Sequence, residues 1–255
     1  MQTLFDTHCH LYNQPLVNNL TDVFARARAA SVCEMLVPGV DRESSRFAVE
    51  LARTQPGVYA AIGYHPDAVD SSGIDMASLS ALIDEGGVCA IGEIGLDTTA
   101  DQPRGPQELA FRMQLTLAAE HNLPVLIHCR GAFGRLLEMV SEIEPRPASG
   151  VLHAYAGSLE VAQQLIAYGY FIGVAGAATR KTATRVRGLV TQVPLDRLVL
   201  ETDAPFIGTA VHPKGQVEPA DLIEVCQALA QLKGVSFEEI AEQTTTNAYK
   251  LFHRL

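Results

Sequence analysis

Two observations predict that this chain folds as an α/β protein, a single (β/α)8 TIM-type barrel of parallel strands. Eight short β-type runs recur along the sequence, and a longer stretch with helical spacing follows each of them, which is typical of repeated βαβ units. The chain has 255 residues, close to the length of about 250 residues that one such barrel occupies. No linker, low-complexity segment or strong repeat divides the sequence, so we expect one domain over residues 1–255.

The predicted strands and helices alternate from the first residues to the last. The strands are Leu4–His8, Glu34–Val37, Val58–Gly63, Val88–Ile94, Val125–His128, Gly150–His153, Phe171–Val174 and Leu198–Glu201. The helices are Leu20–Ala30, Ser44–Thr54, Met76–Glu85, Gln107–Asn122, Phe133–Ile143, Ser158–Tyr168, Thr184–Val193, Pro219–Lys233 and Ser236–Phe252. Pro219 and Ser236 suit helix starts, and Gly169 and Gly234 suit helix ends.

The composition excludes several classes of protein. A hydrophobic content of 47% rules out a disordered, collagen-like or coiled-coil chain. With 19 Lys and Arg against 29 Asp and Glu, the formal net charge is −10, so any nucleic-acid contact is expected to be a small basic patch. The five scattered cysteines predict neither a disulfide framework nor a zinc knuckle. No apolar run approaches the roughly 18 residues of a membrane span. We therefore expect a cytoplasmic protein without membrane contact.

Candidate metal ligands begin at the end of the first predicted strand. Because a strand alternates its faces, His8 and His10 are expected to point the same way and Cys9 the opposite way. Two imidazoles can then meet one cation. A pair of histidines is by itself a weak signal, since two satisfied or solvent-facing side chains would give the same pattern.

Four further candidate ligands fall at or just past the ends of other predicted strands. They are Glu93, His128, His153 and Asp203. In a barrel these strand ends converge on one mouth. A carboxylate such as Glu93 in an apolar run is costly to bury unless it is paired or bound to metal. Six nitrogen and oxygen ligands are too many for one tetrahedral site, but they suit two cations about 3.5–4 Å apart that share a carboxylate.

Several motifs in this sequence resemble the TatD family of metal-dependent deoxyribonucleases, within the amidohydrolase superfamily. They are His8-Cys9-His10, Gly92-Glu93-Ile94-Gly95-Leu96-Asp97, Pro124-Val125-Leu126-Ile127-His128-Cys129-Arg130, Glu201-Thr202-Asp203-Ala204-Pro205 and the segment from Thr244 to Phe252. The resemblance covers essentially the whole chain. The chain departs from the family beside some motifs, as at His153-Ala154-Tyr155, where His-Cys-Phe is usual.

The resemblance implies a distorted barrel with a two-metal centre. One metal would be held by His8, His10, Glu93 and Asp203, and the second by the shared Glu93 with His128 and His153. It also implies hydrolysis of phosphodiesters, often as trimming of DNA from its 3′ end. Some relatives are linked instead to removal of D-amino acids from tRNA.

The expected chemistry is attack by a hydroxide that two metal ions activate. Two cations lower the pKa of a shared water and neutralise charge on the reacting phosphate. Glu93 would bridge them, and Asp203 is the candidate general base, a role compatible with that of a ligand. Four imidazoles favour Zn²⁺, Mn²⁺ or Fe²⁺ on softness, whereas the resemblance points to Mg²⁺.

Four residues are candidates for substrate contact, each with a structural alternative. His65 follows the third predicted strand and is expected to contact phosphate or orient a ligand, or to have no role. Arg130 is suited to clamping a phosphate or to a salt bridge. Arg180 and Lys181 open a basic segment after the seventh predicted strand, where barrels often bind phosphate, although charge runs are often merely solvated.

The function predicted from these residues is that of a divalent-metal-dependent phosphodiesterase, a 3′ to 5′ exonuclease whose expected substrate is single-stranded DNA. Tyr12, Tyr64, Tyr155 and Phe206 near the predicted mouth give modest support for stacking against bases. The alternative is a hydrolase of carbonyl esters or amides, such as a D-aminoacyl-tRNA deacylase or a lactonase. A non-catalytic scaffold is disfavoured because no ligand position is lost. We expect a monomer or weak oligomer.

Overall fold

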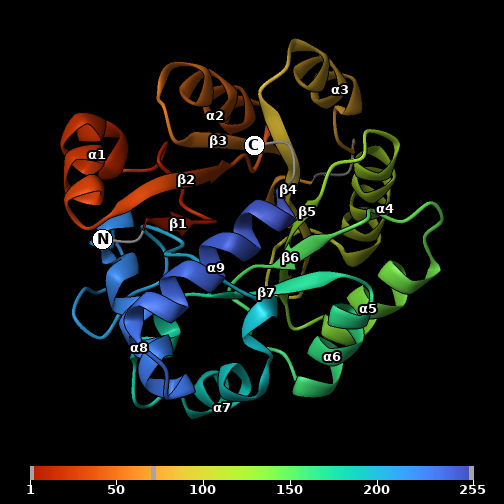
Figure 1. Cartoon of the computed structure of the whole chain (residues 1–255). Helices are drawn as coiled ribbons and strands as arrows, with labels where there is room; N and C mark the ends of the chain where they lie inside the picture. The colour runs from red at the N-terminus through yellow and green to blue at the C-terminus, as the bar shows by residue number, and fades with distance from the viewer. Residues whose placement is uncertain (1–2, 70–72, 253–255) are drawn as a thin grey trace. The chain divides into compact units, whose positions relative to one another are not determined.

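The computed structural model describes residues 3–69 and 73–252, and it confirms the predicted fold class. The eight strands neighbour one another in chain order from β1 to β8, and the strand pairs resolved in detail are parallel. Each strand leads into an α-helix, and one more helix follows the eighth (Figure 1). This alternation is that of a (β/α)8 protein.

The bounds of the elements agree closely with the sequence pattern. The strands are β1 (Leu4–Asp6), β2 (Val32–Pro38), β3 (Val58–Ile62), β4 (Val88–Asp97), β5 (Val125–Arg130), β6 (Gly150–Leu152), β7 (Tyr170–Val174) and β8 (Leu198–Leu200). The helices are α1 (Leu20–Ala29), α2 (Arg42–Thr54), α3 (Met76–Glu85), α4 (Arg104–Glu120), α5 (Phe133–Glu142), α6 (Leu159–Ala167), α7 (Thr184–Gln192), α8 (Leu222–Lys233) and α9 (Phe237–Leu251). In the part of the chain that the structure describes, no helix has both the length and the apolarity to cross a bilayer.

Two compact units make up the described chain, and neither is a continuous segment. The first unit comprises residues 3–37, 153–159 and 172–250. The second unit comprises residues 38–69, 73–152, 160–171 and 251–252. The single domain expected from the sequence stays a prediction.

In the second unit, β4 is buried along its whole length, as strands covered on both faces are. It pairs with β3 and with β5, and Gly95 lies opposite His128. Gly95 has a φ of 149°, and a Cβ there would lie 1.9 Å from the carbonyl oxygen of His128. Only glycine allows this close approach of the two backbones. It sets the register that brings the side chains of β4 and β5 together.

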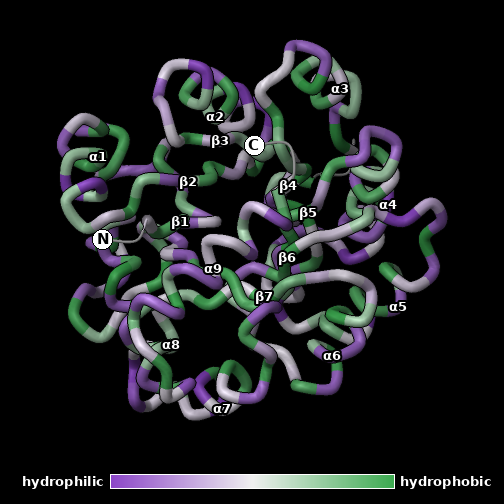
Figure 2. Tube along the Cα trace, viewed as in Figure 1, coloured by the Kyte–Doolittle hydropathy of each residue, from purple (hydrophilic) through white to green (hydrophobic). Residues whose placement is uncertain are grey.

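The helices bury one face and expose the other, which gives the alternating purple and green segments of α1 and α3 in Figure 2. In α2, Asp41 caps the first turn, because its side chain accepts a hydrogen bond from the Ser44 N–H. The Ser44 hydroxyl in turn accepts a hydrogen bond from the Asp41 N–H. Such a cap stabilises a helix by about 1 kcal/mol. Gly234 ends α8 in the left-handed conformation, with a φ of 70°, as its position in the sequence predicts.

Some element ends differ from the predicted ones. β1 ends at Asp6 rather than His8, and β5 runs on to Arg130. Pro219 begins a single 3-10 turn before α8, because its ring fixes the entry into the helix but donates no hydrogen bond.

Candidate metal centre

Three predicted ligands meet in the first unit. The Nε2 atoms of His8 and His10 lie 3.0 Å apart. The Oδ1 atom of Asp203 lies 3.1 Å from Nε2 of His10 and 3.8 Å from Nε2 of His8. All three residues are buried. Two imidazole nitrogens and a carboxylate oxygen thus converge within the reach of one cation.

Backbone contacts between the ends of β1 and β8 hold this cluster. The Asp203 N–H donates to the His8 carbonyl at 2.8 Å, and the His10 N–H donates to the Ala204 carbonyl at 2.8 Å. The buried Asp6 carboxylate accepts hydrogen bonds from Thr202 and from the His8 N–H. Burial raises the pKa of Asp6 to about 8, although these hydrogen bonds oppose the shift. The histidines converge as expected, but a neighbouring strand end positions them rather than alternation along β1.

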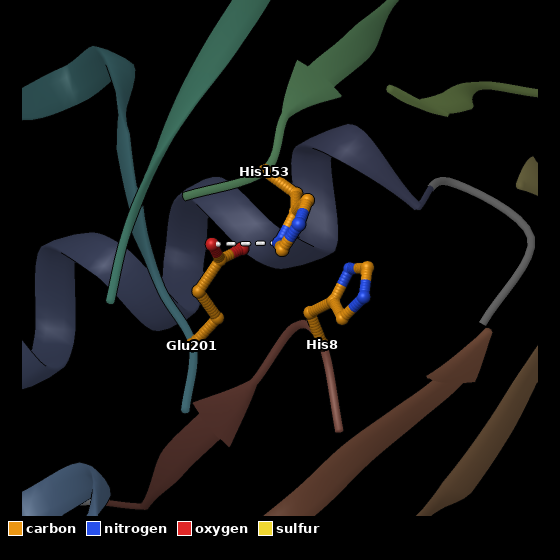
Figure 3. A group of neighbouring side chains, drawn as sticks. All are labelled: His8, His153 and Glu201. Atoms are coloured by element: carbon orange, nitrogen blue, oxygen red, sulfur yellow. Dashed lines mark ion pairs between the residues drawn. The ribbon is translucent and has the colours of Figure 1, made fainter. Parts of the chain in front are cut away.

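His153 lies against His8 and is joined to a further carboxylate, Glu201 (Figure 3). The His8 and His153 rings stack with centroids 4.0 Å apart and planes 19° apart. Nδ1 of His153 lies 3.3 Å from Oε1 of Glu201, which also accepts from the Ala154 N–H. A Cβ at Gly173 would lie 2.5 Å from Oε2 of Glu201. The glycine therefore leaves the space that the carboxylate fills.

Glu201 was missed as a site residue by the sequence analysis, which gave it no role. The signal was present, because Glu201 ends an apolar predicted strand in the same way as Glu93 stands within one. The cost of burying a lone carboxylate applies equally to both. In the structure Glu201 is fully buried.

The buried carboxylates fit a cation. Burial alone would raise the pKa of Asp203, but the charges of His153, His10 and His8 and the hydrogen bond from His10 outweigh it and lower that pKa. Oε2 of Glu201 is buried and has no partner with hydrogen-bond geometry among the described residues. A buried carboxylate oxygen left in this state is costly unless a cation satisfies it.

A second cluster forms in the second unit around Glu93 of β4. Nδ1 of His128, on β5, lies 3.2 Å from Oε1 of Glu93. Nε2 of His65, which follows β3, lies 3.9 Å from the same oxygen. The two imidazole rings contact each other with centroids 4.4 Å apart. The predicted ligands Glu93 and His128 are thus together, and His65 contacts the same carboxylate.

Asp97 holds the other nitrogen of His128, at 3.0 Å from Nε2. It also accepts from the N–H and the hydroxyl of Thr99, each at 2.7 Å. Burial alone would raise the pKa of Asp97, but the hydrogen bonds from His128 and Thr99 lower it well below its usual range. A carboxylate on the far nitrogen of a ligand histidine fixes the ring and its tautomer.

In the first cluster, the Tyr12 hydroxyl holds the other nitrogen of His10, at 2.7 Å from Nδ1.

The residues predicted to contact substrate lie in both units. In the second unit, Arg130 ends β5 with an exposed side chain. In the first unit, Arg180 lines a cavity of about 490 Å³, and the neighbouring Lys181 is exposed and does not line it. Their substrate contacts, the bridging role of Glu93 and the shared site of His128 and His153 stay predictions.

Comparison with known proteins agrees with this chemistry. A family model described as TatD related DNase matches residues 5–253. The metal-dependent hydrolase YabD of Bacillus subtilis is 38% identical over 98% of each chain. The 3′-5′ ssDNA/RNA exonuclease TatD of Cronobacter sakazakii is 35% identical over 98% of this chain and 97% of its own.

A solved structure extends the similarity to the fold. The crystal structure of YjjV, a TatD homologue from Escherichia coli K12, superposes with a TM-score of 0.92 at 31% identity, covering 98% of both chains. Sequence similarity and fold similarity thus span the same residues as the ligand clusters. The chain belongs to the TatD-related DNase family of metal-dependent hydrolases.

Proposed function

We propose that this protein is a metal-dependent exonuclease that removes nucleotides from the 3′ end of single-stranded DNA. The observation that carries the proposal is the convergence of His8, His10 and Asp203 on one buried point, in a chain that belongs to this family. Relatives at about 35% identity are named 3′-5′ ssDNA/RNA exonucleases, which supports a nucleic-acid substrate.

We propose a centre of two divalent ions, Mg²⁺, Mn²⁺ or Zn²⁺. His8, His10, Glu93 and Asp203 would hold one, and Glu93, His128 and His153 the other. When bound, such ions supply Lewis-acid charge to the scissile phosphate and make water a stronger acid. The imidazole donors suit Zn²⁺, and the carboxylate donors suit Mg²⁺ and Mn²⁺.

The protein's own residues would divide the remaining tasks. Asp203, whose lowered pKa keeps it ionised, would accept the proton of the attacking water. Glu201 holds His153, and Asp97 holds His128, so the imidazoles keep one orientation. We propose that His65, Arg130, Arg180 and Lys181 contact substrate phosphates, where cations fix the strand without reading its sequence.

We also propose a monomer or weak oligomer with one domain, located in the cytoplasm. The five cysteines are free thiols, which supports a reducing compartment. Size-exclusion chromatography with light scattering tests the oligomeric state. A stable higher assembly would contradict the proposal.

One experiment tests the proposed activity directly. Metal-loaded protein is incubated with DNA labelled at either end, as single strands and as duplex, alongside D-aminoacyl-tRNA and a panel of small esters and lactones. We expect stepwise shortening of the single strand from the 3′ end. Turnover confined to the aminoacyl ester or the lactones would overturn the nuclease and favour the carbonyl hydrolase.

A further inference from the structure

The cavity of about 490 Å³ in the first unit adjoins the His8, His10 and Asp203 cluster. Its wall includes Ala154, which follows His153, and Phe206, whose ring lies 5.1 Å from the ring of His10. The segments that follow β6, β7 and β8 all contribute to it. Cavities of this size hold small organic ligands.

The charge of this cavity is positive in an acidic protein. Arg180 and Lys214 line it, and no Asp or Glu is among the lining residues. Both side chains are exposed, and within the ranges 3–69 and 73–252 neither forms an ion pair. The whole chain carries a net charge of −10, so the two cations mark this cavity as a place that attracts an anion.

An aromatic face accompanies the two cations. Phe206 keeps 40% of its surface exposed, which is unusual for so large an apolar side chain. Nζ of Lys214 lies 5.8 Å from the centre of its ring. Phe206 thus contacts both His10 of the ligand cluster and a cation of the cavity.

Hydrogen bonds hold the loops that carry these residues. The Thr179 hydroxyl donates to the Gly176 carbonyl and accepts from the Ala210 N–H, each at 2.7 Å, so the segment after β7 is tied to the segment after β8. Gly215 N–H donates to the Pro205 carbonyl at 2.7 Å. Nδ1 of His212 lies 2.9 Å from Oδ1 of Asp221. These contacts fix the loop before a ligand arrives, which lowers the entropic cost of binding.

We infer that this cavity binds one nucleotide of the single-stranded substrate, next to the phosphate that is cleaved. The base would pack against Phe206, and a backbone phosphate would lie between Arg180 and Lys214. Two cations and an aromatic ring are the groups by which proteins hold single-stranded nucleic acid without reading its sequence. The inference rests on the proposed nuclease function. It adds Lys214, which the sequence analysis did not single out.

The test compares Arg180→Ala, Lys214→Ala and Phe206→Leu with Arg185→Ala as the matched control. Arg185 belongs to the same basic segment but does not line the cavity. With metal-loaded protein and single-stranded oligothymidylate, we expect KM to rise about tenfold for Arg180→Ala and for Lys214→Ala, with kcat within about twofold of the parent. Each charge removal should also reduce the salt dependence by about one phosphate contact.

Phe206→Leu separates stacking from charge, since it keeps an apolar side chain and removes the ring. We expect a raised KM with an unchanged salt dependence. Arg185→Ala should match the parent in both measurements. Thermal melting of each variant checks that the exposed substitutions leave the fold intact.

The outcomes separate the subsite from the proposed function. If the parent cleaves the oligonucleotide and Lys214→Ala behaves like Arg185→Ala, the subsite is overturned and the nuclease stands. If the parent does not cleave it, the nuclease fails, and fluorescence anisotropy with a labelled phosphorothioate pentathymidylate decides the subsite alone. Weaker binding by Lys214→Ala than by Arg185→Ala supports it, and equal binding overturns it.

Discussion

The two ligand clusters differ in how far they are shielded from water. In the first unit, His8, His10 and His153 are buried and share two carboxylates, Asp203 and Glu201. In the second unit, the side chains of His65 and His128 keep 13% and 18% of their surface exposed around the carboxylate of Glu93, and Asp97 holds the far nitrogen of His128. The first cluster is therefore a closed set of ligands, and the second is more open to solvent and to an incoming group.

The largest expected effect comes from removing a carboxylate from either cluster. We expect Asp203→Ala and Glu93→Ala each to lower hydrolysis by at least about 10³-fold, because each removes a proposed metal ligand. Since Glu93 is the proposed bridge, Glu93→Ala should lose both ions, whereas Asp203→Ala should lose one. Metal analysis of the purified variants measures this. Full metal content in Glu93→Ala would show that Glu93 is not the bridge.

Removing one histidine from each cluster shows how much each cluster contributes to the free energy of unfolding. We expect His128→Ala and His153→Ala both to abolish detectable hydrolysis while circular dichroism shows a retained fold. His153→Ala should also cost about 2 kcal/mol of unfolding free energy, because it leaves the buried Glu201 without its imidazole partner. The His128 side chain is 18% exposed, so its loss should be milder. Equal melting temperatures would contradict the contrast in burial.

A smaller effect is expected from the groups that hold the ligand rings. Asp97→Asn keeps an acceptor for Nε2 of His128 but removes the charge, and we expect metal affinity to fall about 10-fold to 100-fold. Tyr12→Phe removes a neutral hydroxyl from Nδ1 of His10 and should cost less than about 10-fold. Competition with a chelator measures both affinities. A larger loss of metal affinity in Tyr12→Phe than in Asp97→Asn would mean that the buried cluster depends more on the hydroxyl that holds His10 than the second cluster depends on Asp97.

The smallest expected difference is in the alkylation rates of the cysteines, two of which lie beside candidate ligands. Burial raises the pKa of Cys9 well above its usual value and that of Cys129 to about 12. A raised pKa leaves a thiol protonated at pH 8, so alkylation is slow and increases as the pH rises toward the pKa. Cys33 is exposed and Cys9 is fully buried. Timed labelling with mass spectrometry should give the order Cys33, Cys129, Cys9, and faster labelling of Cys9 than Cys129 would reverse the comparison.

The fold could be predicted because each element carries its own local signal. Apolar runs fixed the eight strands to within a few residues, and Gly234 marked the end of α8. The ends of β1 and β5 were less predictable, because they depend on hydrogen bonds to strands distant in the sequence. His10 is held by the carbonyl of Ala204, and nothing near His10 in the sequence shows this contact.

The candidate ligands could be named from the sequence more readily than the residues that hold them. Histidines at strand ends are visible in a sequence, whereas the pairing of His153 with Glu201 and the stacking of His8 on His153 depend on where β6 and β8 lie. The position of Lys214 at the cavity could not be predicted from the sequence for the same reason. It is an isolated lysine in the sequence, and the folded loop after β8 places it with Arg180 around one cavity.

The discontinuity of the first unit also sets the order in which the clusters can form during synthesis. Glu93 and His128 lie on the neighbouring strands β4 and β5. They can meet once the chain up to the end of β5 has left the ribosome. His8 emerges far earlier than either, but Asp203 and the carbonyl of Ala204 that hold its surroundings are made only after β8. Because chains fold from the N-terminus during translation, the backbone contacts that hold His8 and His10 can form only after β8 has been synthesised.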